Sequence, residues 1–186
     1  MVAELLEGLT VPWWIAGGCA IDLFVGRQLR PHGDTDVLIR RDDQLRLQDH
    51  LAGWDLHRAT YPGLEPWGTG EYLAGRYRDI WCRHTPDAAW CLQVMLLDTE
   101  DDHWVFKRDP TIRGPLADLG RVSPDGVPYL APEIQLLYKA RPETQAKGQI
   151  DFEAARPLLD AAPGNWLLAA LRKRFPDGHP WITALA

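Results

Sequence analysis

The sequence predicts an α/β (α+β) protein with a helical C-terminal part. Three observations predict this class. Over residues 1–108, short apolar runs bounded by glycine or turn residues alternate with segments of helical periodicity. Residues 109–130 are rich in proline and glycine, which indicates a linker. Residues 131–186 contain successive helical patterns, so we expect a core, a linker and a helical part with these boundaries.

Short apolar runs define the expected strands of the core, because a buried strand is typically a run of four to eight apolar residues. The first run stops at the glycine pair Gly17 and Gly18, and the second begins with Asp34 and Asp36. The turn sequence at 85–88 joins the last two runs into a strand pair. The expected strands cover residues 12–18, 34–40, 55–60, 77–84 and 89–98.

The expected helices are recognised by their periodicity and by the residues at their ends. Ala20, Leu23 and Phe24 share one face of a helix that Gly26 can terminate. Pro132 suits the first position of a later helix. The segment 61–75, rich in glycine and proline, is expected to be a loop. The expected helices cover residues 3–10, 19–26, 41–54, 132–141, 148–161 and 163–175.

Composition narrows the class of protein. The formal net charge of −6 argues against a broad nucleic-acid-binding face, which is normally basic. No apolar run approaches 18 residues, so we expect no membrane span. The acidic N-terminus does not resemble a signal peptide, and three cysteines form no metal-ligand pattern. These features favour a cytoplasmic protein with free thiols.

An acidic segment stands out near the end of the core. Asp98, Glu100, Asp101 and Asp102 lie within five residues that contain no base. A solvated turn is the ordinary explanation. The alternative is an acidic rim that attracts a cationic substrate into a cleft.

The glycine pair and the aspartate pair together predict a chemistry. Asp34 and Asp36, two positions apart at the start of a strand, present their carboxylates on one face. Two such carboxylates repel each other unless a cation lies between them, and they suit Mg²⁺, which also takes substrate phosphates as ligands. Gly17 and Gly18 have no side chains, so their N–H groups can approach a phosphate at a helix start. The combination predicts phosphoryl or nucleotidyl transfer.

The stretch GGCAIDLFVGRQLRPHGDTDVLIRRDDQ resembles the signature of the nucleotidyltransferase superfamily that includes DNA polymerase beta. It is most similar to the lincosamide and aminoglycoside 2''-O-nucleotidyltransferases. The resemblance implies a nucleotidyltransferase fold, with a mixed twisted β-sheet flanked by helices and a catalytic core over 1–108. It also implies ATP or another nucleoside triphosphate as donor, with Mg²⁺ at the aspartate pair. A hydroxyl of the acceptor would attack the α-phosphate and release pyrophosphate. The matching residues are Gly17, Gly18, Asp22, Gly26, Arg27, Arg30, His32, Asp34 and Asp36.

The chain departs from this family at the third carboxylate, which completes the metal site or accepts the proton of the acceptor hydroxyl. Aligning residues 89–98 with the relevant strand places Gln93 at that position. Glutamine can bind a metal through its carbonyl oxygen but cannot take a proton. Asp98 lies five residues later, on the opposite face of a regular strand, so it could serve only through a bulge or twist. The catalytic candidates are therefore Asp34, Asp36, Gln93 and Asp98.

Three basic residues are candidates for binding the triphosphate. Arg30 and His32 precede the aspartate pair and could contact phosphates, or they could fix their loop against Asp22. Lys139 could reach the phosphates from the helical part, as basic residues do in relatives, or it could be a solvated helical lysine. Asp22 is expected to pair with Arg27 or Arg30.

The predicted function is Mg²⁺-dependent transfer of a nucleoside monophosphate to a hydroxyl of a small acceptor, such as an aminoglycoside or lincosamide. The acidic chain favours a small acceptor over RNA, and the acidic segment favours a cationic one. One alternative is a toxin-type transferase acting on tRNA, for which Arg172, Lys173 and Arg174 could begin a basic surface. Another is a degenerate nucleotide-binding module in which Gln93 marks lost catalysis. The resemblance is also compatible with a homodimer that completes a cleft.

Overall fold

The computed structural model describes residues 2–60, 62–141 and 146–186. Its strands are short, and they come from both the predicted core and the segment that follows it. The strands are β1 Trp13–Ile15, β2 Thr35–Arg40, β3 Asp55–Ala59, β4 Leu64–Pro66, β5 Asp79–Arg83, β6 Leu92–Leu97, β7 Thr99–Glu100, β8 His103–Val105, β9 Arg113–Pro115, β10 Gly120–Val122 and β11 Pro128–Leu130.

In the described residues one helix precedes the first strand, two lie among the first strands, and four follow the last one. None of the described helices has the length and apolar character needed to span a bilayer. The helices are α1 Val2–Leu5, α2 Gly17–Val25, α3 Gln44–His50, α4 Pro132–Lys139, α5 Ala146–Ala155, α6 Ala161–Arg174 and α7 Pro180–Leu185, with 3₁₀ turns at Arg41–Asp43, Leu116–Asp118 and Arg156–Leu158.

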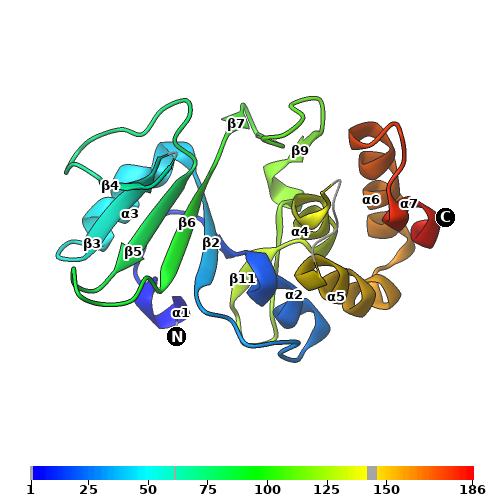
Figure 1. The fold of residues 1–186 in the computed structure, drawn as a ribbon, viewed down its shortest axis with the longest axis horizontal. Helices are drawn as coiled ribbons and strands as arrows, with labels where there is room; N and C mark the ends of the chain where they lie inside the picture. The colour runs from blue at the N-terminus through cyan, green and yellow to red at the C-terminus, as the bar shows by residue number, and fades with distance from the viewer. Residues whose placement is uncertain (1, 61, 142–145) are drawn as a thin grey trace.

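The main sheet has eight strands in the order β10-β11-β1-β2-β6-β5-β3-β4. β2 runs parallel to β6 and β1 parallel to β11, whereas the other neighbours are antiparallel. The mixed sheet flanked by helices is thus confirmed. Figure 1 shows α3 beside β3 and β5 at one end of the molecule and the helices α4 to α7 at the other. A second sheet, β7-β8-β9, connects the two ends.

The predicted linker over residues 109–130 is wrong as a description of this segment. It contains β9, β10 and β11, and β11 pairs with β1 through Ile15 and Tyr129. β10 then forms the edge of the main sheet. Its proline and glycine content obscured these three-residue strands, which are too short to show a period of two. The segment is therefore part of the sheet, and it leads directly into α4.

Three smaller expectations also need correction. α1 ends at Leu5 rather than at residue 10, and the expected loop over 61–75 contains β4. α2 begins at Gly17, so the glycine pair forms the first turn of the helix instead of ending the strand. The end of α2 is as expected, because Gly26 adopts a left-handed conformation with φ of 78°.

The uninterrupted apolar run of β2 reflects burial of both faces of the sheet. Val37 and Ile39 belong to a core that includes Leu47 of α3. Leu38, on the opposite face, belongs to a second core built mainly from the C-terminal helices. Asp36 precedes these residues on the Leu38 face, where the sheet meets those helices. The strand thus carries its polar residue at the junction of the two cores.

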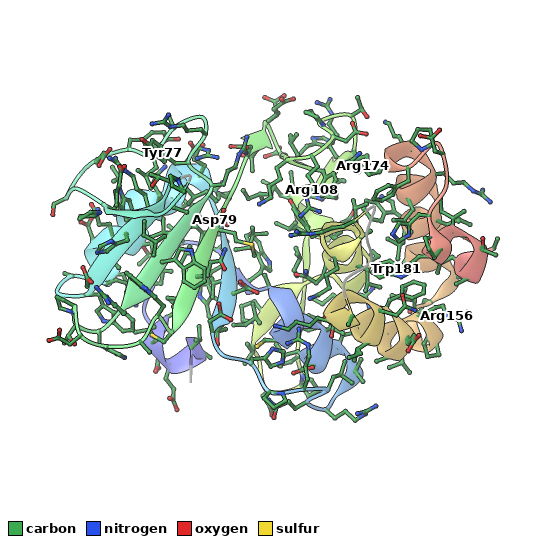
Figure 2. All side chains as sticks on the ribbon, in the orientation of Figure 1. Tyr77, Asp79, Arg108, Arg156, Arg174 and Trp181 are labelled. Carbon is green, nitrogen blue, oxygen red and sulfur yellow. The ribbon has the colours of Figure 1, made fainter. Side chains whose placement is uncertain are left out.

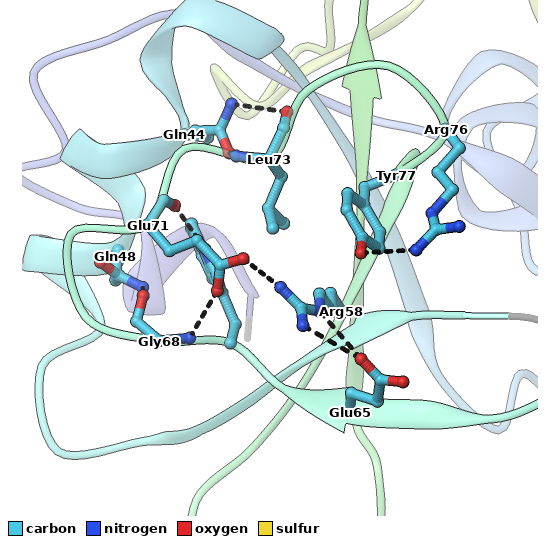
Figure 3. Close-up of polar contacts among 10 residues, drawn as sticks. Gln44, Gln48, Arg58, Glu65, Gly68, Glu71, Leu73, Arg76 and Tyr77 are labelled. Atoms are coloured by element: carbon cyan, nitrogen blue, oxygen red, sulfur yellow. Dashed lines mark hydrogen bonds and ion pairs between the residues drawn. The ribbon is translucent and has the colours of Figure 1, made fainter.

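Polar side chains fix the connection between β4 and β5, as Figure 3 shows. Arg58 on β3 forms ion pairs with Glu65, at 3.0 Å, and with Glu71. The Gln44 side chain accepts a hydrogen bond from the Leu73 N–H at 2.7 Å and donates one to the Leu73 carbonyl at 3.2 Å. These contacts hold the connection against β3 and α3. They thereby fix the position of the chain just before β5, which begins at Asp79.

Candidate active site

A cleft of about 360 Å³ lies between the main sheet and the helices α4 and α5. One wall consists of strand residues, including Asp36, Asp79 and Gln93. The opposite wall carries a series of cations. These are Arg30, Lys107, Arg108, Lys139, Arg141 and Lys147. A smaller cavity of about 200 Å³ shares Arg30, Asp36, Lys139 and Lys147 with the cleft.

The two glycines are needed because side chains of the cleft occupy the space beside them. A Cβ atom on Gly17 would lie 1.8 Å from Oδ2 of Asp36, and one on Gly18 would lie 2.4 Å from Cε1 of His32. Gly17 also has φ of 64°, which a residue with a side chain rarely adopts. The glycine pair therefore lets the aspartate wall and the His32 loop approach the start of α2.

The backbone N–H of Gly17 has a partner in this structure. It donates a 2.8 Å hydrogen bond to Oε1 of Gln135 on α4. The preceding N–H, of Ala16, donates to the carbonyl of Asp36 at 2.8 Å. A phosphate that uses the Gly17 N–H, as the sequence predicted, would have to replace Gln135. The bond ties α4 to the first turn of α2.

Asp36 and Asp34 form the predicted carboxylate pair. Burial, with the nearby charge of Asp34, raises the pKa of Asp36 above its ordinary value, and Lys139 opposes the shift. The pair therefore lacks enough positive charge in the protein alone, and a divalent cation would supply it. No described residues form a ready cluster of three metal-binding side chains. Two carboxylates still suit Mg²⁺, which completes its shell with phosphate oxygens and water.

Gln93 lies beside Asp36, as the alignment predicted, because the two residues pair across β2 and β6. Its side-chain amide donates a 3.1 Å hydrogen bond to Oδ1 of Asp79 on β5. Asp79 is paired with Met95, two residues beyond Gln93, so it points to the same face and lines the cleft. Sequence analysis missed Asp79. Its place directly before the apolar residues of a strand, like that of Asp36, was the available signal.

Asp98 also lines the cleft, but both of its oxygens have cationic partners. Oδ1 lies 2.5 Å from Nε of Arg41, and Oδ2 pairs with Nη1 of Arg78. A carboxylate that accepts two guanidinium contacts is held in its charged form and is a weak proton acceptor. The arrangement therefore supports a structural task for Asp98, namely holding two arginines at the end of β6.

His32 is fixed between two charged side chains. Its Nε2 lies 2.6 Å from Oδ2 of Asp22, and its Nδ1 lies 3.1 Å from Nη1 of Arg30. Since a guanidinium can only donate, Nδ1 accepts and Nε2 donates to Asp22. Asp22 also accepts from the Leu29 N–H at 3.1 Å. The expected pairing of Asp22 with Arg27 or Arg30 is therefore replaced by a pairing with His32, which orients Arg30.

Lys139 and Arg30 share one buried carboxylate that sequence analysis did not identify. Oδ2 of Asp151, on α5, lies 2.7 Å from Nζ of Lys139 and 3.5 Å from Nη2 of Arg30. The Asp151 side chain is fully buried, whereas the two cations are partly exposed toward the cavities. Two cations on one carboxylate leave an excess positive charge. Arg30 and Lys139 both line the cleft and the smaller cavity, and their predicted role in binding phosphate stays a prediction.

Known proteins resemble this chain in part of its sequence and in its fold. Residues 1–60 match the aminoglycoside-2''-adenylyltransferase family. The lincosamide antibiotic adenylyltransferase LnuA, in its lincomycin-bound crystal structure, superposes with a TM-score of 0.59 at 17% identity, over 85% of this chain and 94% of that chain. ANT(2'')-Ia in complex with adenylyl-2''-tobramycin gives 0.59 at 16% identity, over 94% of each chain.

A more distant likeness has the same fold. A nucleotidyltransferase-like antigen from Paracoccidioides brasiliensis superposes with a TM-score of 0.51 at 17% identity, over 99% of this chain and 88% of that chain. No curated protein gives a significant sequence match. The chain therefore has the nucleotidyltransferase fold of antibiotic-modifying adenylyltransferases, and its first 60 residues carry the aminoglycoside-2''-adenylyltransferase signature.

Proposed function

We propose that the protein transfers a nucleoside monophosphate from a nucleoside triphosphate, with Mg²⁺, to a hydroxyl of a small acceptor. One observation carries the proposal. Asp34 and Asp36 line one cavity with Arg30 and Lys139, and the pKa of Asp36 stays raised although Lys139 opposes the shift. The ion-pair partner that Arg30 and Lys139 share is a single carboxylate. This is the charge pattern that a metal-bound triphosphate completes.

Each side chain has a distinct task in this scheme. Asp34 and Asp36 would hold the cation through carboxylate oxygens, and Arg30 and Lys139 would bind phosphate oxygens. Bound Mg²⁺ would neutralise phosphate charge and make the α-phosphorus more electrophilic. The acceptor oxygen forms a bond to the α-phosphorus, the bond from that phosphorus to the bridging oxygen of the β-phosphate breaks, and pyrophosphate leaves. His32 keeps Arg30 in place through its bond to Asp22.

Asp79 is our candidate for the proton acceptor. It lies on the cleft face of the sheet beside Gln93, and unlike Asp98 it has no arginine partner among the described residues. Gln93, which cannot take a proton itself, holds one oxygen of Asp79 through its amide. The other oxygen can accept the hydroxyl proton as the new phosphorus–oxygen bond forms. The third carboxylate would thus come from β5 rather than β6.

Acceptor-dependent release of pyrophosphate tests the proposal. The protein is incubated with Mg²⁺, each labelled nucleoside triphosphate in turn, and a panel of aminoglycosides, lincosamides, sugar phosphates and bulk tRNA. We expect a labelled small-molecule product, and none from Asp36→Asn. Labelled tRNA alone would favour the toxin-type alternative. Nucleotide binding without any labelled product would favour a module that has lost catalysis.

A further inference from the structure

Three arginines line another cavity, an open one beside the cleft, which we call the arginine cavity. Arg108 follows β8, Arg141 follows α4, and Arg174 ends α6. Together with Ala140 they line a space of about 360 Å³, and Arg108 and Arg141 also line the cleft. Figure 2 shows Arg108 and Arg174 on the helical side of the molecule, across from Asp79. Segments far apart in the sequence thus place three guanidinium groups around one space.

These arginines have no close carboxylate partner among the described residues, although the exposed Asp109 lies near enough to Arg174 to interact with its charge. None of them forms an ion pair with a carboxylate in the described part of the chain. Arg108 donates one 2.7 Å hydrogen bond to the Tyr138 carbonyl, and Nε of Arg174 is buried without a partner. Burial and the charges of Arg141 and Arg174 lower the pKa of Arg108. Among the described residues, the cavity therefore presents one buried donor without a partner and three guanidinium groups without a close carboxylate.

Helix capping explains only part of this cluster. Cations are favourable near helix C-termini, and Arg108 contacts a carbonyl in the last turn of α4. The guanidinium of Arg108 alone makes this contact with the end of α4. The side chains of Arg141 and Arg174 make no hydrogen bond in the described residues. Their approach to Arg108 raises the energy of the unliganded protein, since like charges repel in a partly buried site.

The acidic segment does not offset this charge. Asp98 is paired with Arg41 and Arg78, and Glu100 is paired with Arg113 at 2.8 Å. Two of the four carboxylates that favoured a cationic acceptor are therefore already neutralised. A polycationic acceptor in the cleft would instead meet the arginine cavity.

We propose that the acceptor carries an anionic group, a phosphate monoester, which Arg108, Arg141 and Arg174 bind while its hydroxyl faces Asp79. This inference rests on the proposed function and names the chemistry of its acceptor. The triphosphate has its own cations, Arg30 and Lys139, in the other cavity. Guanidinium groups suit phosphate because their paired donors match its oxygens. The acidic chain favours a small phosphate ester over RNA.

Binding of simple probes tests the inference. The protein is first saturated with Mg²⁺ and a non-hydrolysable ATP analogue, so that the triphosphate site is filled. Glucose 6-phosphate, glucose, inorganic phosphate, tobramycin and bulk tRNA are then titrated by calorimetry. We expect glucose 6-phosphate and inorganic phosphate to bind once per chain and glucose not to bind. Arg141→Gln and Arg174→Gln should each weaken phosphate binding about tenfold, the effect of losing one charge-assisted hydrogen bond.

Arg46→Gln is the matched control, because it removes an exposed arginine from α3 with the same change of charge. It should leave phosphate binding unchanged, and all three variants should bind the ATP analogue normally. Preferred binding of tobramycin or tRNA, or equal phosphate binding by the arginine variants and the control, would overturn the inference. Either result leaves the proposed function intact as long as the ATP analogue binds with Mg²⁺. Loss of that binding in the wild-type protein would instead contradict the proposed function.

Discussion

The two walls of the cleft differ in charge and in how the chain builds them. The strand wall carries Asp36, Gln93 and Asp79 on adjacent strands, and their positions follow from register. The helix wall carries arginines and lysines from the connection after β8 and from α4 to α6. The strand wall therefore suits cations and proton transfer, and the helix wall suits phosphate groups. Neither wall alone is electrostatically complete. In our proposals a metal-bound triphosphate would balance the aspartate pair, Arg30 and Lys139, and the acceptor phosphate would balance the arginine cavity.

The largest expected effect concerns the proton acceptor on the strand wall. Asp79→Asn should slow transfer by about 10²–10⁴-fold, the usual contribution of a positioned general base. Binding of the Mg²⁺–ATP complex should be unchanged. Asp98→Asn is the comparison, and it should lower thermal stability through loss of its contacts with Arg41 and Arg78. Pyrophosphate release measures both rates. If Asp98→Asn transferred slowly while Asp79→Asn kept the wild-type rate, Asp98 rather than Asp79 would be the proton acceptor.

The next effect concerns the helix wall. Asp151→Asn leaves Arg30 and Lys139 without their buried counter-ion, and breaking such a contact typically costs about 3 kcal/mol of the free energy of unfolding. Affinity for the ATP analogue should fall as the two cations lose their positions. Glu153→Gln, an exposed change on the same helix, should alter neither quantity. Urea unfolding and nucleotide titration test this, and equal results for the two variants would remove Asp151 from the site.

A smaller effect on stability is expected from the close contact between Gly17, at the start of α2, and Asp36 on β2. Gly17→Ala and Gly26→Ala both place a side chain at positive φ, which costs about 1 kcal/mol. Only the Cβ at position 17 would strike another group, the Asp36 carboxylate, whereas position 26 is open. We expect Gly17→Ala to lower the free energy of unfolding by about 1–2 kcal/mol more than Gly26→Ala does. Equal unfolding midpoints for the two variants would show that the close contact between position 17 and the Asp36 carboxylate does not affect stability.

The smallest effect is the pH dependence of the strand wall. Because the pKa of Asp36 is raised, Mg²⁺-dependent nucleotide affinity should increase as pH rises through that pKa, by up to about tenfold per unit. Stability without metal should run the other way. The folded state keeps the Asp36 proton to higher pH than the unfolded state does. The free energy of unfolding therefore falls as pH rises from the unfolded-state pKa to the folded-state pKa of Asp36. Asp36→Asn should remove both trends, and trends that persist in that variant would have to come from another group.

More residues of the strand wall than of the helix wall could be identified from the sequence. Asp34, Asp36 and the glycine pair lie within 20 residues, so spacing and a local resemblance were enough, and register confirmed the place of Gln93. Asp79 was missed because its position depends on how β5 pairs with β6. Asp151 meets Arg30 across 121 residues of chain, and the arginine cluster likewise depends on how distant segments pack together. Strands β9 to β11 were missed because three residues carry no readable period.

The central claim is that Asp36 and its neighbours hold the metal of a nucleoside triphosphate. Calorimetric titration of a non-hydrolysable ATP analogue, with and without Mg²⁺, tests it on the wild type, on Asp36→Asn and on Asp87→Asn, an exposed control. We predict Mg²⁺-dependent binding by the wild type and the control. Asp36→Asn should show none, although it stays folded and gains about 0.5–2 kcal/mol in stability from the relieved repulsion. Unchanged Mg²⁺-dependent affinity in a folded Asp36→Asn would contradict the claim.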